Sequence, residues 1–157
     1  MQVQIKVATI LSLIHNFHEG LKKSINVVNN EKKSNAKRQA ELIQLIDLLK
    51  ALWKAEEGSL YQVLLKKEHS QTATYDAIED HAIAFILIED LEALDYKNRW
   101  NTQTASKARV LAELVMHHIS ENENEFFKEA RSVLSHPELV SLAEKFLSEY
   151  ETELTDE

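Results

Sequence analysis

The segment VATILSLIHNFHEGLKKSINVV, residues 7–28, predicts the fold because its apolar residues recur at alternating steps of four and three. This spacing places them in one stripe along a helix, and such stripes pack helices together at shallow angles. Apolar rows of the same period begin again at Leu42, Ala77 and Ala108. The sequence therefore predicts an all-α protein built as an up-down-up-down four-helix bundle.

The composition agrees with a helical fold. The chain has 157 residues, with only 2 Gly and 1 Pro, too few for the turns that a β-sheet needs. With no Cys, disulfides, thiolate metal sites and cysteine nucleophiles are excluded. We expect a single domain over residues 1–157.

A short fifth helix is predicted near the C-terminus. Ser135 and Glu138 have the spacing of a capping box, in which each side chain bonds the other residue's backbone N–H. Pro137 falls in the first turn, where a missing N–H costs little. We place this helix at roughly residues 136–150.

Charge and hydropathy limit the partners. The net charge of -8 repels phosphate backbones, so nucleic acid is not expected as a partner. No apolar run approaches the roughly 20 residues that span a bilayer, so no membrane partner is expected either. The N-terminal segment lacks an export signal, and we expect a soluble, cytoplasmic protein.

Each bundle helix carries a polar side chain in its apolar stripe. These residues are His18, Glu56, His81, and His118 followed by Asn122. One inward histidine is more often a hydrogen-bonded core residue than a ligand. A buried carboxylate needs a partner, however, and all four helices place a polar side chain inward near their middle, which together favours a metal site. Imidazole and carboxylate donors without thiolate suit iron, manganese or zinc, and the donor types alone do not choose among them.

The chain also resembles a known family. VMHHISENENEFFKEAR, residues 115–131, joins a His-His-Ile start to an acidic run and an aromatic pair, and KAEEGSLY, residues 54–61, has paired glutamates before Leu-Tyr. With EDHAIAFILIEDLEAL, residues 79–94, and NFHEGLKKSI, residues 16–25, this order resembles the hemerythrin-like family of HHE cation-binding domains. The resemblance covers roughly residues 10–131, and the ferritin-like Glu-x-x-His motif is absent.

The resemblance implies a metal site with two departures. His18, Glu56, His81 and His118 match ligand positions of the family, whereas Leu52 replaces a ligand His and Asn122 replaces a bridging carboxylate. The family pattern assigns His81 and His118 to one iron and His18 to the other. We therefore predict an incomplete di-iron site that holds one metal firmly through His81, His118 and Glu56. His18 either joins this metal or holds a weaker second ion, and Asn122 is a weak donor at most.

Other residues near these positions have two interpretations. Glu57, Glu123 and Asp80 either accept hydrogen bonds from ligand imidazoles or are solvated surface acids, which is the commoner situation. His117 with Glu121, and His15 with Glu19, would replace the inward residues if their helices were rotated by about 100°. Otherwise His117 is a solvated or supporting residue, and His15 packs beside its stripe.

The resemblance implies a non-haem iron protein that binds or senses a small ligand such as dioxygen, nitric oxide or peroxide. One or two ions would be bound, with zinc or manganese as other candidates. We expect no enzyme, although bound iron would allow weak peroxidase or oxidase-type activity. The alternative is a degenerate member without metal that acts as a helical interaction or scaffold module. A mononuclear zinc hydrolase is the least favoured, because no base or substrate cleft can be located.

Overall fold

The structure is a computed structural model that describes residues 8–155. Val7, which we placed in the first stripe, lies outside the described residues. The helices are α1 (Ile10–Val28), α2 (Asn35–Glu57), α3 (Leu60–Leu65), α4 (Glu68–Ala93), α5 (Thr102–Glu121), the π-helix η1 (Asn122–Phe126), α6 (Phe127–Val133) and α7 (His136–Thr155). The described residues contain no strand, which confirms the all-α prediction.

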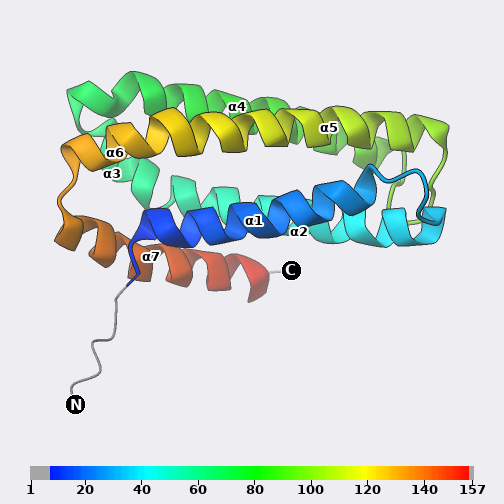
Figure 1. Cartoon of the computed structure of the whole chain (residues 1–157), viewed down its shortest axis with the longest axis horizontal. Coiled ribbons are helices and arrows are strands. Elements are labelled where there is room, and N and C mark those ends of the chain that lie inside the picture. The colour runs from blue at the N-terminus through cyan, green and yellow to red at the C-terminus, as the bar shows by residue number, and fades with distance from the viewer. Residues whose placement is uncertain (1–7, 156–157) are drawn as a thin grey trace, which may run out of the picture.

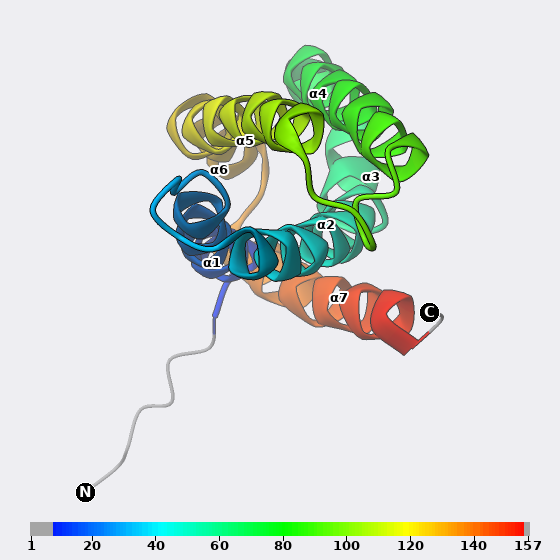
Figure 2. The same cartoon turned by 90° about the vertical axis from the view of Figure 1, so that its right-hand side faces the viewer.

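Four rods form the bundle seen in Figures 1 and 2. They are α1, α2 with α3, α4, and a continuous rod made of α5, η1 and α6. Helix α1 lies against α2, and α4 lies against α5. Helix α7 lies outside the bundle across α1 and α2 (Figure 2). The predicted bundle with an added C-terminal helix is confirmed.

The apolar stripes form the core as predicted. In α1, the apolar side chains from Leu11 to Val28 in the stripe are buried, and His18 is buried among them. The same holds for the rows that begin at Leu42, Ala77 and Ala108, apart from Val63 and Val133, which are half-buried. No helix of the described residues is both long and apolar enough to cross a bilayer.

The second rod is broken, although its apolar row continues from Leu42 to Val63. Helix α2 ends at Glu57 with Gly58 as its C-cap, and Ser59 has φ -129° and ψ -87°, outside the helical region. The hydroxyl of Ser59 donates to the carbonyl of Ala55, which satisfies that oxygen at the helix end. The short helix α3 then starts, and it directs Tyr61 back toward the end of α2.

Helix α7 starts where predicted and ends later. The N–H of Glu138 donates to Ser135 Oγ, and the N–H of Ser135 donates to the Glu138 carboxylate, so the capping box is present. The helix runs to Thr155 rather than to residue 150. Its last turns are held by Tyr150, whose ring lies 4.7 Å from that of Phe17.

Candidate metal centre

Three rods bring one carboxylate and two imidazoles together inside the bundle. Glu56 comes from the end of α2, His81 from α4 and His118 from α5. All three are buried, and one ligand atom from each lies within 4.8 Å of the others. The Nε2 atoms of His81 and His118 are 3.1 Å apart, and Nε2 of His81 lies 3.5 Å from Glu56 Oε2. Three of the four residues predicted to bind metal therefore lie together.

His18, the fourth predicted ligand, does not belong to this cluster. It is fully buried in α1, and its Nε2 atom has no hydrogen-bond partner among residues 8–155. Leu52 is fully buried in α2 and carries no donor atom. A second metal position would need His18 and a second imidazole, and of these two only His18 is present.

Each of the three buried imidazoles has a carboxylate at its Nδ1 atom, and each carboxylate comes from a different helix. The pairs are Glu57 with His81 at 2.9 Å, Asp80 with His118 at 3.2 Å, and Glu123 with His18 at 3.2 Å. These are the acids for which the sequence left two interpretations, and the hydrogen-bonded one is correct. Carboxylates at this position fix the orientation of an imidazole and raise its basicity toward a metal.

The hydrogen bonds have a consequence for the inward-facing nitrogens. A neutral imidazole carries one proton, and a carboxylate at Nδ1 holds that proton there. Nε2 of His81 and Nε2 of His118 then both present lone pairs at 3.1 Å. Asn122 Nδ2 lies 3.3 Å from the second of these atoms and donates weakly to it. Two facing lone pairs in a dry core favour a cation between them.

The electrostatics of the cluster follow from its burial. Burial lowers the pKa of His81 to about 4, although the hydrogen bond with Glu57 acts in the other direction. Burial likewise lowers the pKa of His18 to about 4. Burial raises the pKa of Glu56 to about 8, against the hydrogen bond from Tyr61. Without a cation, the imidazoles of His81 and His18 are therefore neutral near neutral pH, and the carboxyl group of Glu56 retains its proton.

Two aromatic residues contact the cluster in a way that the sequence analysis missed. Trp53 and Tyr61 are both buried. The ring of Trp53 stacks on His81 with centroids 4.3 Å apart, and the hydroxyl of Tyr61 donates to Glu56 Oε2 at 3.0 Å. For Trp53 the available signal was its position three residues before Glu56, on the same helix face. For Tyr61 the available signal was its place at the end of KAEEGSLY, but its approach to Glu56 depends on the break after α2.

The π-helix η1 begins at Asn122, four residues after His118. A π-turn adds a residue to the helical repeat and often occurs at functional sites. It allows two consecutive residues to be buried on different sides, with Phe126 against Tyr61 and Phe127 against His18. Asn122 is itself buried, and its Oδ1 atom has no hydrogen-bond partner within the described range.

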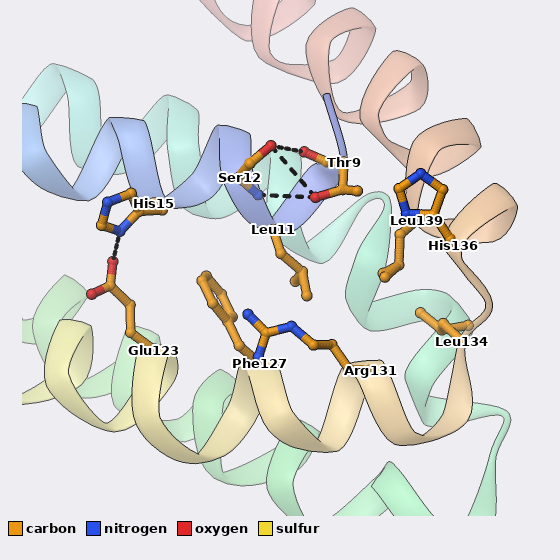
Figure 3. Close-up of a pocket in the computed structure, with 10 residues that line it drawn as sticks. All are labelled: Thr9, Leu11, Ser12, His15, Glu123, Phe127, Arg131, Leu134, His136 and Leu139. Carbon is orange, nitrogen blue, oxygen red and sulfur yellow. Dashed lines mark hydrogen bonds and ion pairs between the residues drawn. The ribbon is translucent and has the colours of Figure 1, made fainter. Parts of the chain in front are cut away.

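The rotated register considered for the fourth rod is wrong. His117 is exposed and pairs with Glu121 at 3.1 Å, because the apolar stripe turns His118 inward instead. His15 is half exposed and contacts Glu123 (Figure 3). The same carboxylate also bonds to His18.

His15, Glu19 and Glu123 form a second group of possible metal ligands, at the surface. His15 and Glu123 line a cavity of about 600 Å³ beside α1 and α6 (Figure 3). None of Glu56, His81 and His118 lines that cavity. The surface group is therefore separate from the buried cluster.

The buried cluster fits a metal ion. Metal–nitrogen bonds of about 2.0–2.1 Å place neighbouring ligand atoms on one ion about 3 Å apart, as the two Nε2 atoms are. Glu56 Oε1 is buried without a hydrogen-bond partner among the described residues, so one carboxylate oxygen is available. Two imidazoles and one carboxylate leave coordination positions open, a donor set that iron shares with zinc and manganese.

The fold and the cluster together define a four-helix bundle with the donor set of a cation-binding protein. The chain belongs to the hemerythrin HHE cation binding domain family, whose match covers residues 9–130. Searches of curated proteins and of solved structures gave no match.

Proposed function

We propose that the protein binds one metal cation through Glu56, His81 and His118, and that the bound cation binds or senses a small ligand. The observation that carries this proposal is the 3.1 Å approach of two Nε2 atoms whose rings are held by carboxylates at Nδ1. A shared cation turns the repulsion between two lone pairs into attraction. Membership in a cation-binding family supports the same conclusion.

A single tight site is favoured over two. Among the described residues, His18 Nε2 has no hydrogen-bond partner, but the apolar Leu52 stands where the family pattern has the second imidazole. Asn122 offers a neutral amide where two cations would need a bridging carboxylate. A second ion would therefore have one imidazole, from His18, and no bridging carboxylate from position 122.

Iron is the cation that we propose, because two imidazoles and one carboxylate with open positions suit iron that binds a small ligand such as dioxygen. When bound, iron would supply redox chemistry and an attachment point for dioxygen, nitric oxide or peroxide. Manganese and zinc use the same donors and are distinguished by the experiment below. We propose a binding or sensing role without turnover, and any peroxidase or oxidase-type activity would be a weak consequence of bound iron.

The surrounding residues position the ligands and exclude water. Tyr61 donates to Glu56 Oε2 and lies 3.4 Å from Nε2 of His81, so its hydroxyl orients the carboxylate. Trp53 covers one face of His81 and also contacts His118, with ring centroids 5.6 Å apart. A small ligand would meet an apolar wall with the Tyr61 hydroxyl as the nearby polar group, its proton already donated to Glu56.

A metal-free interaction module is the second candidate. The Tyr61 hydrogen bond favours it, because this bond and a retained proton stabilise Glu56 without any cation. Leu52 and Asn122 favour it as well. In this case the bundle would serve as a scaffold for a helical partner.

Elemental analysis of freshly purified protein, with an absorption spectrum in air, separates these functions. The proposal expects one iron per chain and near-ultraviolet charge-transfer absorption. The His118→Ala variant should lose both, whereas the matched His117→Ala variant should retain both because His117 is exposed. Circular dichroism checks that each variant is folded. A wild-type protein that binds no metal, or a colourless protein with zinc, contradicts the iron proposal.

A further inference from the structure

An acidic cavity lies between α4 and the α5–η1 rod. It has a volume of about 230 Å³ and is lined by carboxylates from both rods, with His118 and Asn122 also in its wall. The carboxylates are Asp76 and Asp80 from α4, Glu121 from α5, and Glu125 from η1. This cavity therefore joins an acidic surface to a residue of the buried cluster.

The charge of the acidic cavity has one sign. No Lys or Arg is among its lining residues, and Asp76 and Glu125 are exposed at its mouth. Glu121 pairs with the exposed His117, and Asp80 pairs with His118. The larger cavity beside α1 differs, because it contains Arg131 and none of the three cluster residues (Figure 3). Cations are attracted to the first cavity more strongly than to the second.

Asn122 supplies an observation that does not depend on these acids. Its side chain is 3% exposed, and its Oδ1 atom has no hydrogen-bond partner in the part of the chain that the structure describes. A buried amide oxygen without a donor is costly unless something occupies its lone pairs. Amide and carboxylate oxygens are ligands that hard divalent cations accept. Asn122 thus marks the inner end of the acidic cavity as a place for a cation in transit.

We propose that the acidic cavity is the route by which a hydrated divalent cation reaches the buried cluster. Asp76, Glu121 and Glu125 concentrate cations at the mouth, and Asn122 Oδ1 replaces part of the hydration shell beside His118. This inference rests on the proposed function, since it needs a cation at the cluster. A cleft lined by one sign of charge raises association rates about 10- to 1,000-fold, and salt removes the effect.

The test follows Co²⁺ uptake by metal-free protein in a stopped-flow instrument. Trp53 reports on the cluster because its ring stacks on His81. The chain has 2 Trp residues, so the Trp100→Phe background leaves Trp53 as the sole tryptophan, which is excited selectively at wavelengths that tyrosine does not absorb. Trp100 lies elsewhere, with the Arg38 guanidinium 5.0 Å from its ring.

In that background, Asp76→Asn with Glu125→Gln should slow uptake about three- to tenfold at low salt and leave one Co²⁺ per chain at the end point. The difference should vanish at about 0.5 M salt. The matched control is Glu89→Gln with Glu113→Gln, which removes the same charge from exposed positions outside the acidic cavity. Ala73→Leu, which narrows the cavity without a charge change, should slow uptake at every salt concentration.

Equal rates for the two double variants at low salt would overturn the route while leaving the metal site intact. So would normal uptake by Ala73→Leu. A wild-type protein that takes up no cation would overturn both the route and the proposed function.

Discussion

Nε2 of His81 lies 3.1 Å from Nε2 of His118 in the core of the bundle, and each ring has a carboxylate at its other nitrogen. Neither nitrogen of this contact carries a proton when the rings are neutral. The pair is unfavourable in the metal-free protein and favourable around a cation. Under the proposed function, the cluster would couple folding to metal binding.

Asp80→Asn should weaken metal binding about 10- to 100-fold, because a neutral amide lowers the basicity of His118. Competition with a chelator of known affinity measures this change. Glu79→Gln is the matched control, since Glu79 is an exposed neighbour on the same helix. Unchanged affinity in Asp80→Asn would show that the carboxylate does not support the ligand.

Tyr61→Phe should destabilise the metal-free protein by about 1–3 kcal/mol, because Glu56 Oε2 loses its buried donor. Urea unfolding of metal-free protein measures the loss. Tyr75→Phe is the control, because Tyr75 is 57% exposed and its change should have little effect. If both variants unfold at the same urea concentration, the Tyr61 hydrogen bond contributes nothing to stability.

Leu52→His with Asn122→Asp should raise the metal content from one to two ions per chain. The pair restores the imidazole that the family pattern has at position 52 and a carboxylate able to bridge two ions, while His18 Nε2 is without a hydrogen-bond partner among the described residues. Metal-to-protein ratios after dialysis measure the result, with each single variant as a control. A double variant that stays at one ion would mean that His18 is not positioned to bind metal.

The stability of the metal-free protein should depend on pH with a maximum near about pH 6.5. The pKa values of His18 and His81 are about 4 in the folded protein and 6.5 in the unfolded chain. The unfolded chain therefore binds more protons at these residues, and stability is lost as pH falls from 6.5 toward 4. The pKa of Glu56 is about 8 in the folded state and 4.5 otherwise, so stability falls as pH rises toward 8.

Between about pH 4.5 and 6.5 the unfolded chain binds up to two protons at His18 and His81 that the folded protein does not, and the folded protein binds one at Glu56 that the unfolded chain does not. The net difference of about one proton makes the free energy of unfolding rise with pH by about 1.4 kcal/mol per pH unit. Thermal or urea unfolding across this range measures it. Glu56→Gln should abolish the decline above pH 6.5. A stability that keeps rising to pH 8 in the unmodified protein would contradict the raised pKa of Glu56.

Much of the site was accessible from the sequence because helical periodicity is local. The stripe through His81 and Ala84 and the row through Leu111 and His118 depend only on spacing along one chain segment, so inward positions could be predicted. The capping box at Ser135 was predictable for the same reason.

The choices that the sequence left open involve two helices at once. Whether Asp80 is a surface acid or a partner of His118 depends on the distance between α4 and α5. The position of Tyr61 depends on the break after α2, and the burial of both Phe126 and Phe127 depends on a π-turn. Single-segment patterns contain none of this information.

The sequence by itself determined that four helices would turn His18, Glu56, His81 and His118 toward a common interior, since a repeat near 3.6 residues sets which side of a helix each residue occupies. Only the tertiary structure decided that three of them meet and that His18 stays apart. The separation between side chains on different helices is set by how the helices rotate, pack and bend against one another, and this is a property of the whole core.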